Sequence, residues 1–492
     1  MTMPSLEKFF APQSVAIVGA SDTPGRVGHA VIRNLISSGF MGPIYPVNAG
    51  RNKINGIPAF PTLTAIGKAI DLAVVATPID AVPGVIADCA QSGIGNAIVL
   101  SAGGKETGPA GAQLEQTILA TARQGGVRLI GPNCVGVIST AANLNTSFLD
   151  RMPPAGNIAF ISQSGALCTA VLDFAAARDF GFSKFISIGN KADVDELDLL
   201  QYLHQDLDTD VIMLYVEELR RGSSFVKTVK EITSGDRPTP VLVIKSGRTS
   251  AGAEAAASHT GALAGTEAVY DAIFEQAGVI RVDTIDELFD FANAFAFKSE
   301  SRLGKITRRI PNGNRVAIVT NAGGPGIVAT DMTVYSGLKL AQLAPETVEV
   351  LASHLPSTAN IHNPVDVIGD ATQDRYENAL AAVIRDQGVD GALVILTPQS
   401  MTNALETAKA ITKVARHSHK PILSSFMGIV DVSAGVQYLQ GQGYPVYRFP
   451  ENAAKSFGAL YRYSQWLNRQ KMAPLRFTYD VDKARGIIAD CL

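Results

Sequence analysis

His259 is a residue whose type and surroundings could carry a reactive group. It lies in AEAAASHTGALAG, where small residues on both sides predict a mobile loop and a poorly buried imidazole. A nucleophilic histidine needs a partner on its other ring nitrogen to fix the tautomer. Glu217, at the end of the apolar run VIMLYVE, is a candidate for that partner. The alternative is a structural histidine and a solvated carboxylate beside Glu218.

Two segments of small residues could bind a phosphoryl group. Ser164 and Gly165 lie in SQSGA at 162–166, and Gly323 and Gly324 lie in NAGGPG at 321–326. Each segment follows an apolar run and opens a helix, where backbone N–H groups and the helix dipole favour an anion. SQSGA has no lysine of the P-loop type, so a single small anion fits better than a nucleoside triphosphate. Two such helix starts aimed at one point could hold a phosphoryl group between them.

A further set of loops follows the apolar runs of the first 150 residues. Gly19, Gly25 and Gly28 have the spacing G-x5-G-x2-G, which differs from the G-x-G-x-x-G of NAD enzymes. More loops follow at ATPID (76–80), SAGGKETG (101–108) and LIGPNCVGV (129–137). Ligands of parallel sheets bind beyond the carboxyl ends of the strands, so we expect these loops to converge on one ligand. An NAD-binding domain is the competing interpretation.

The elements that must position these loops are strands and helices in alternation. Apolar runs such as SVAIVGA, DLAVVAT, NIAFISQ, RVAIVTN and GALVILT alternate with amphipathic segments of helix length, which predicts α/β domains with buried parallel sheets. At about 150 residues per domain, 492 residues suggest about three domains. The proline-rich stretch DRMPPAGN predicts a boundary near 150, and the basic stretch 298–314 with Arg308-Arg309 predicts a solvated linker. The predicted units are 1–150, 151–300 and 314–470, with a linker at 471–492.

An internal similarity links two of these units. GNIAFISQSGA (156–166) and GNRVAIVTNAGGPG (313–326) share a Gly-Asn pair, an apolar strand, a small polar residue and a glycine that opens a helix. Duplication of one α/β unit would explain this layout. The alternative is that all parallel α/β units look alike at this level.

Composition excludes several classes of function. The net charge of −3 and the absence of a basic excess argue against a nucleic-acid partner. The four cysteines are widely spaced, which argues against a zinc site and a disulfide framework, and we expect no metal site. No apolar stretch approaches 18 residues, and the N-terminus does not resemble a signal peptide, so we expect a cytoplasmic protein with no membrane span.

The motifs taken in order resemble one family. VAIVGAS, YPVN, ATP, GPNCVG, SQSGA, YVE, SHTGALAG, NAGGPG and NPVDVIGDA, over about residues 5–470, resemble the succinyl-CoA synthetase superfamily and most closely its ADP-forming acetyl-CoA synthetase branch. The resemblance implies a Rossmann-like CoA-binding domain followed by two flavodoxin-like domains. The residues that it places at the CoA site are Gly19, Ala20, Ser21, Gly25, Asn48, Thr77, Pro78, Ala102, Gly103 and Asn133. Ala49-Gly50 follows YPVN where the family has Pro and then Lys or Asn, so Arg26 or Arg51 is expected to replace a phosphate contact.

The same resemblance implies a reaction, in which an acid, CoA and ATP give acyl-CoA, ADP and phosphate. His259 would be phosphorylated, Glu217 would stabilise it, and the phosphate would lie between the helix starts at Ser164-Gly165 and Gly323-Gly324. Glu218 stands where the family more often has glycine, which leaves both carboxylates as candidates.

The family's nucleotide site is an ATP-grasp module, which the sequence does not contain. ATP, ADP and Mg are therefore expected on an ATP-grasp subunit or fused domain, in an oligomer. The chain would be an α-type subunit or the front part of a fused protein. A CoA-binding regulatory or acyltransferase-linked relative without ligase activity is the alternative.

Overall fold

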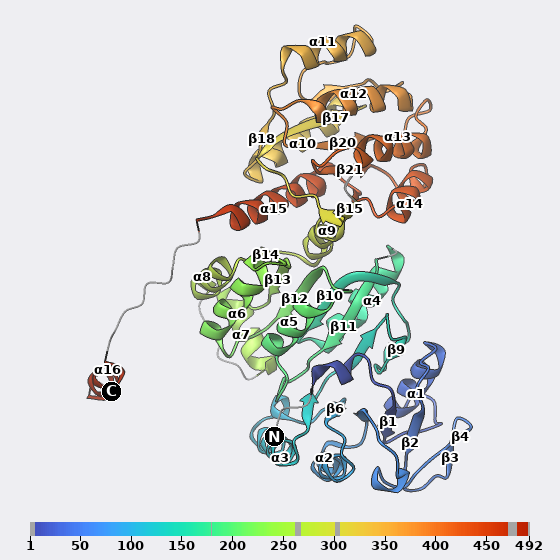
Figure 1. The fold of residues 1–492 in the computed structure, drawn as a ribbon, viewed down its shortest axis with the longest axis vertical. Helices are drawn as coiled ribbons and strands as arrows, with labels where there is room; N and C mark the ends of the chain where they lie inside the picture. The colour runs from blue at the N-terminus through green and yellow to red at the C-terminus, as the bar shows by residue number, and fades with distance from the viewer. Residues whose placement is uncertain (1–4, 179, 261–266, 301–305, 471–479, 491–492) are drawn as a thin grey trace.

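Three mainly parallel sheets follow one another along the chain, each with helices packed against it (Figure 1). The computed structural model describes residues 5–490 except residue 179 and the stretches 261–266, 301–305 and 471–479. In each sheet the main parallel strands, numbered as they occur in the chain, lie in the order second, first, third, fourth, fifth. This arrangement confirms the predicted α/β class, with a Rossmann-like sheet followed by two flavodoxin-like sheets. Among the described residues, no helix has the length and hydropathy that a bilayer span needs.

The first unit (η1 to β7) contains a sheet in the order β2-β1-β5-β6-β7. Every residue of β1, β5 and β6 is buried, because helices cover both faces of the sheet. Its elements are η1 Leu6–Phe9, β1 Val15–Val18, α1 Val27–Ser37, β2 Ile44–Val47, β3 Lys53–Ile54, β4 Ile57–Pro58, η2 Thr64–Ile66, β5 Leu72–Val75, η3 Ile79–Ala81, α2 Val82–Gln91, β6 Asn96–Val99, η4 Lys105–Thr107, α3 Pro109–Gly125 and β7 Arg128–Ile130.

The second unit (β8 to α9) contains a sheet in the order β14-β13-β12-β10-β11-β8-β9. β8 pairs antiparallel with β11, so this sheet takes two strands from before residue 150, where the sequence places a boundary; that division stays a prediction. The elements are β8 Val137–Ser139, β9 Leu144–Asn145, β10 Ala155–Ser162, α4 Gly165–Ala177, β11 Phe182–Ser187, α5 Glu196–Gln205, β12 Val211–Val216, α6 Gly222–Ser234, β13 Val241–Lys245, α7 Ser250–Thr260, α8 Glu267–Ala277, β14 Ile280–Val282 and α9 Ile285–Ala296.

The third unit (β17 to α15) contains a sheet in the order β18-β17-β20-β21-β22, and β19 also pairs with β17. A helix, α16 Val481–Asp490, lies in the stretch that the sequence predicts to be linker. The elements of the unit are β17 Arg315–Thr320, α10 Gly323–Tyr335, β18 Lys339–Leu340, α11 Pro345–His354, β19 Val365–Asp366, α12 Gln373–Arg385, β20 Gly391–Leu396, α13 Ala404–Arg416, β21 Ile422–Phe426, α14 Ser433–Gly441, β22 Val446–Tyr447 and α15 Pro450–Asn468.

The connection between the second and third units is structured, so the prediction of a solvated linker at Arg308-Arg309 is wrong. β15 Lys298–Glu300 and β16 Ile306–Arg308 pair antiparallel. Arg308 donates hydrogen bonds to the backbone oxygens of Phe295 (2.6 Å) and Asp210 (2.8 Å). Arg309 is only 4% exposed, and its guanidinium lies over the ring of Phe297. Arg308 anchors the connection to the second unit, and Arg309 packs against an aromatic ring instead of extending into water.

One hydrophobic core joins the second and third units. It includes Phe160 and Phe289 from the second unit and Ile318, Leu393 and Phe457 from the third. α15 packs against both α9 and α10, which places it at the junction (Figure 1). Burial of large apolar side chains on both sides fixes the orientation of the third unit relative to the second.

Candidate functional site

A cavity of about 620 Å³ lies between the first and second units, where the carboxyl ends of several strands of both sheets meet. The convergence of strand-end loops agrees with the rule that parallel sheets bind ligands at this edge. The residues that line the cavity are Val27, Ala76, Thr77, Leu100, Ser101, Ala102, Lys105, Glu106, Asn133, Cys134, Val135, Phe148, Gln163, Ser164, Gly165, Ala166, Thr169, Gly189, Asn190, Lys191, Glu217 and Glu218.

The glycine-rich turn after β1 brings the backbone close to the neighbouring strand. Gly19 has φ +86°, and a Cβ at this position would lie 2.8 Å from the carbonyl carbon of Ala76. A Cβ on Gly28 would lie 2.1 Å from the Gly19 oxygen, so the start of α1 is packed directly onto β1. Asn48 links the ends of β1 and β2, because its Nδ2 donates to the Ala20 oxygen at 2.8 Å. These contacts explain why glycine stands at positions 19 and 28.

The predicted CoA-site residues divide into two sets. Thr77, Ala102 and Asn133 line the cavity. The others lie in the loops around it and are not among the described residues of its wall; they are Gly19, Ala20, Ser21, Gly25, Asn48, Pro78 and Gly103.

Thr77 and Asn133 offer polar atoms to a ligand. The Oγ1 atom of Thr77 is buried and has no hydrogen-bond partner in the described part of the chain. Such an orphaned polar atom in a cavity wall suits a bound molecule that supplies the missing hydrogen bond. Asn133 has φ +55°, and its Nδ2 donates to Asn190 Oδ1 at 3.2 Å, which ties the first unit to the second.

The start of α4 provides the first predicted phosphate site. Ser164 is the N-cap, and its Oγ accepts a hydrogen bond from Leu167 N at 3.3 Å. Ser162 Oγ accepts from Ser164 N (3.0 Å) and donates to Ser164 O (2.8 Å), which fixes the turn before the helix. A Cβ on Gly165 would lie 3.0 Å from Val135 Cγ2, so the cavity wall leaves little room for a side chain here. The N-terminal end of the α4 dipole thus faces the cavity, as anion binding requires.

Gln163 holds the end of β12, where Glu217 and Glu218 lie. Its side-chain Oε1 accepts from Glu217 N (2.8 Å) and Glu218 N (3.1 Å), and its Nε2 donates to Glu218 O (3.0 Å). Lys191 Nζ donates to the same oxygen at 2.7 Å and pairs with Glu196 Oε2 at 2.9 Å. Burial lowers the pKa of Lys191, whereas its pairing with Glu196 opposes that shift. The end of β12 is therefore fixed by an amide and a buried lysine.

Glu218 lies among cations at the end of β12. Glu218 Oε1 lies 3.2 Å from Lys105 Nζ and 3.0 Å from Arg220 Nε. Burial alone would raise the pKa of Glu218, but Lys105, Arg220 and Lys191 outweigh it and lower the pKa. Glu218 is thus held ionised by these cations.

Sequence reasoning missed Gln163, Lys105, Asn190 and Lys191 as site residues. All four line the cavity; Lys105 and Gln163 lie in strand-end loops identified from the sequence, and Asn190 and Lys191 lie in the loop after β11. The signal was available in those loops, but their polar side chains become informative only when the contacts between the two units are known.

His259 lies in the last turn of α7, so the residues up to Thr260 are helical and the prediction of a loop there is wrong. Its side chain, like residues 261–266, lies outside the described part of the structure. α7 packs against the turn η4, which carries Lys105 at the cavity.

Gly323 and Gly324 begin α10 in the third unit. They are not among the described residues that line the cavity, and both are exposed. The structure therefore brings Ser164, Gly165 and Glu217 together at the cavity. The second predicted helix start, at Gly323-Gly324, is not among the described residues of the cavity wall in the same chain.

Cys134 is the thiol in the cavity wall. Burial raises its pKa to about 12, and its Sγ donates to Val99 O at 3.3 Å. A thiol held protonated in this way is a poor nucleophile. Among the described residues, no three His, Cys, Asp or Glu side chains gather as metal ligands.

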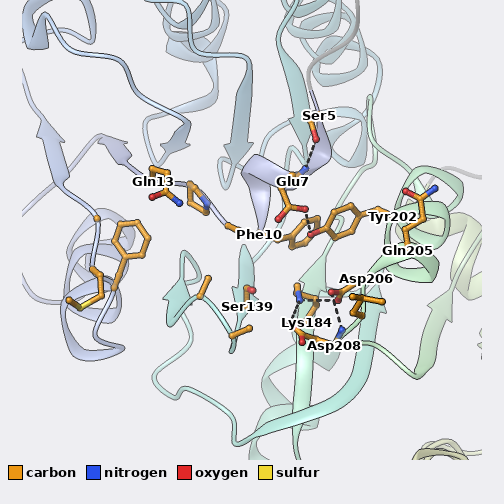
Figure 2. A pocket seen from close by; sticks show the side chains of 18 of the residues that line it. Ser5, Glu7, Phe10, Gln13, Ser139, Lys184, Tyr202, Gln205, Asp206 and Asp208 are labelled. Atoms are coloured by element: carbon orange, nitrogen blue, oxygen red, sulfur yellow. Dashed lines mark hydrogen bonds and ion pairs between the residues drawn. The ribbon is translucent and has the colours of Figure 1, made fainter. Parts of the chain in front are cut away.

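A larger cavity, of about 960 Å³, lies where strands of the first two units begin, opposite the edge just described (Figure 2). Figure 2 shows Lys184 beside Asp206 and Asp208, and Tyr202 beside Phe10. Lys184 Nζ lies 2.9 Å from Asp206 Oδ2. The rings of Phe10 and Tyr202 stack, with their centroids 4.5 Å apart. None of the predicted site residues is among the described residues that line this cavity.

Family models match three consecutive stretches of the chain. They are a CoA binding domain at residues 13–140, a succinyl-CoA ligase like flavodoxin domain at 155–295 and a ligase-CoA domain at 316–470.

Two curated relatives match nearly the whole chain. The chain is 37% identical to acetate–CoA ligase (ADP-forming) I of Archaeoglobus fulgidus, over 99% of this chain and 68% of that protein. It is 38% identical to acetate–CoA ligase (ADP-forming) I subunit alpha of Pyrococcus furiosus, over 95% of this chain and 99% of that protein. The match thus covers about two thirds of the first protein and nearly all of the second.

A solved structure has the same fold throughout. It is acetyl-coenzyme A synthetase 1 of Ca. Korarchaeum cryptofilum, solved in complex with phosphate and ADP. The TM-score is 0.88 at 34% identity, and the match covers 95% of this chain and 99% of that chain.

Proposed function

The chain belongs to the ADP-forming acyl-CoA synthetases, a family of acid–thiol ligases, and we propose that it supplies the CoA-binding and phosphohistidine-carrying part of such a ligase. One observation carries this proposal. The strand-end loops of the first unit, the helix start at Ser164-Gly165 and the carboxylate of Glu217 meet at one cavity. CoA and a phosphoryl group can therefore react within a single enclosure.

The reaction takes place in three transfers. The terminal phosphoryl group of ATP moves to a ring nitrogen of His259, and ADP leaves. The carboxylate of the acid then takes the phosphoryl group from His259, which forms an acyl phosphate. The CoA thiolate attacks the carbonyl carbon, the bond from that carbon to the phosphate oxygen breaks, and inorganic phosphate leaves. Positioning and electrostatic stabilisation are the protein's contribution to such transfers.

Each group of residues has a defined task in this scheme. The N-terminal end of α4 stabilises the charge of the phosphoryl oxygens. Glu217 accepts a hydrogen bond from the imidazole N–H and so presents the other ring nitrogen to phosphorus. Thr77, Ala102 and Asn133 hold CoA beside this point.

The second helix start requires a further chain. α10 is held against the second unit through α15, so Gly323 and Gly324 cannot move to the cavity without breaking a shared core. The same helix exposes an apolar face made of Ile327, Val328, Val334 and Tyr335, whose exposure runs from 47% to 82%. Such a stripe marks an interaction surface.

We propose that this apolar face of α10 binds a second copy of the chain. The site lacks a second helix start, and every copy carries one on α10 directly before the apolar face. The face of α4 that begins at the cavity exposes the small residues Ala166, Thr169 and Ala170, which leave room for the larger side chains of α10. A symmetric pair would complete two sites at once.

The nucleotide is bound elsewhere. An ATP-grasp subunit or fused domain supplies the sites for ATP and Mg, and α7 moves His259 between that site and the cavity. The name of the Pyrococcus furiosus relative as a subunit alpha supports an assembly of this kind.

The test follows phosphate on His259. The chain is incubated with the ATP-grasp partner and radiolabelled Mg-ATP, and acid-labile, alkali-stable phosphate is measured. His259→Ala should abolish the label, whereas the matched control His362→Ala, at an exposed position of the third unit, should keep it. Glu217→Gln should slow labelling by about tenfold or more, and by more than Glu218→Gln. Labelled His259→Ala, or the reverse order of the two glutamates, contradicts the assignment.

A further inference from the structure

An ion pair crosses the cavity from the first unit to the second. Lys105 Nζ in η4 lies 3.2 Å from Glu218 Oε1 at the end of β12. The two side chains are 25% and 21% exposed, so the pair is partly removed from water and less screened than a surface pair. Lys105 follows closely after Ala102 and Gly103, which are assigned to the CoA site.

The turn that carries Lys105 takes its shape from contacts with the second unit. Glu106 Oε1 accepts from the backbone N–H groups of Gly103 (2.7 Å) and Gly104 (3.1 Å). Asn190 of the second unit donates from Nδ2 to Glu106 Oε2 (2.5 Å) and to Glu115 Oε2 (2.7 Å). Burial alone would raise the pKa of Glu106, but these donors outweigh it and lower the pKa.

The backbone of Glu218 is held in place by side chains of the second unit. Its backbone oxygen accepts from Gln163 Nε2 (3.0 Å) and Lys191 Nζ (2.7 Å). Gln163 directly precedes the N-cap of α4, so the contacts form a continuous connection from the phosphate-binding helix start to the turn at Lys105.

We propose that Glu218 is a positioning residue for CoA. Through Lys105 it holds the turn Ala102–Thr107 in the shape that binds CoA, and it thereby connects the CoA site to the end of β12 and the start of α4. This inference rests on the proposed function, because it requires that CoA binds to the first unit. It gives Glu218 a task distinct from that of Glu217, although the two residues are adjacent.

The direction in which loss of the Glu218 charge changes the CoA affinity separates a positioning role from a direct electrostatic role. CoA carries several phosphate charges, so a carboxylate that acted on CoA through its field alone would weaken binding, and its removal would strengthen it. The positioning role predicts the opposite for Glu218, because its loss releases Lys105 and the turn. Loss of Lys105 weakens binding in either case.

The experiment is calorimetry of free CoA with the full chain. Glu218→Gln and Lys105→Met should each raise the Kd by about fivefold, the value of a partly buried ion pair. The double variant should also be weakened by about fivefold and not by the product of the two effects. Lys105→Arg, which keeps the charge, should stay near the wild-type Kd. Lys230→Met and Glu349→Gln, at exposed positions that are not among the described residues lining the cavity, are the matched controls.

The outcomes are distinct. Tighter or unchanged CoA binding by Glu218→Gln overturns the inference, and so do additive losses in the double variant. Because Lys105 and Glu218 belong to different units, a folding defect in one variant leaves the other as an independent test. Failure of the wild-type chain to bind CoA would refute the proposed function itself.

Discussion

Gly19 and Gly25 form a matched pair that tests the CoA site, since both have a left-handed backbone but only one has a close neighbour. Their φ angles are +86° and +84°. A Cβ on Gly19 would lie 2.8 Å from both the carbon and the oxygen of the Ala76 carbonyl, whereas a Cβ on Gly25 would meet nothing within 4 Å. Substitution by alanine therefore adds the same backbone strain at both positions and a steric clash at Gly19 alone.

The expected costs follow from these distances. The left-handed conformation costs alanine about 1 kcal/mol, so Gly25→Ala should lower the free energy of unfolding by about that amount. At Gly19 the neighbour is backbone that cannot rotate away, and forced overlap adds about 2 kcal/mol, for a total of about 3 kcal/mol. The relief of the clash must move β1 away from β5, and that displaces Thr77 in the cavity wall.

Denaturant unfolding with and without CoA measures both effects. A chain of three units need not unfold in one step, so the transition to compare is the one that CoA shifts. Gly25→Ala should weaken CoA binding less than Gly19→Ala does, because no neighbour of its Cβ has to shift, whereas Gly19→Ala should weaken binding by at least tenfold. Equal costs at the two positions, or wild-type CoA binding by Gly19→Ala, would show that the close approach of β1 and β5 does not shape this site.

Three further predictions concern the assembly and the pH dependence. The chain alone should release no ADP from Mg-ATP, acid and CoA, and addition of the ATP-grasp partner should restore turnover; substantial turnover by the chain alone would reveal a nucleotide site within it. Ile327→Asp should convert a dimer into a monomer in sedimentation and reduce His259 labelling, while Glu349→Gln, at an exposed position of α11, should do neither; a dimer that survives Ile327→Asp contradicts the assigned surface. The cations beside Glu218 lower its pKa, so its ion pair stabilises the folded chain above the ordinary glutamate pKa of about 4.3 and is lost as the pH falls through the lowered value. The difference in unfolding midpoint between the wild type and Glu218→Gln should therefore be constant near neutral pH and shrink below about pH 4; a difference that grows on acidification would contradict the lowered pKa.

The sheets were predictable because burial decides them. The runs SVAIVGA and DLAVVAT are apolar on both faces, and β1 and β5 are buried throughout, as a covered parallel sheet requires. The convergence of strand-end loops followed from the geometry of parallel strands, and Thr77, Asn133 and Ser164 meet at one cavity. The helix α7 could also have been predicted, because AGAEAAAS is rich in alanine, the strongest helix former.

The contacts between units were beyond the sequence because they join residues far apart in the chain. Lys105 and Glu218 are separated by 113 positions, and nothing in SAGGKETG or YVEE marks either side chain for the other. Arg309 shows the same limit: two adjacent arginines predict solvent exposure, yet the guanidinium lies over the rings of Phe297 and of the distant Tyr444 in the third unit. Packing of this kind depends on which units face one another.

The internal similarity gains support from side-chain contacts more than from strand order, since all three sheets share that order. In the second unit, Ser162 Oγ bonds both the N–H and the oxygen of Ser164. In the third unit, Thr320 Oγ1 bonds both the N–H (3.1 Å) and the oxygen (2.9 Å) of Ala322, the residue before Gly323.

The amide beside this turn is matched as well. Gln163 in the second unit joins the end of β10 to the end of β12, and Asn321 joins the end of β17 to that of β20 through Thr397 N at 2.9 Å. The two helix starts therefore share the same pattern of hydroxyl and amide hydrogen bonds, and duplication of one unit explains this likeness. Equivalent helix starts in one chain, of which only the α4 start is among the described residues that line the cavity, can act on a single phosphate when two chains pair, and this is the physical reason to expect the active site at an interface between copies.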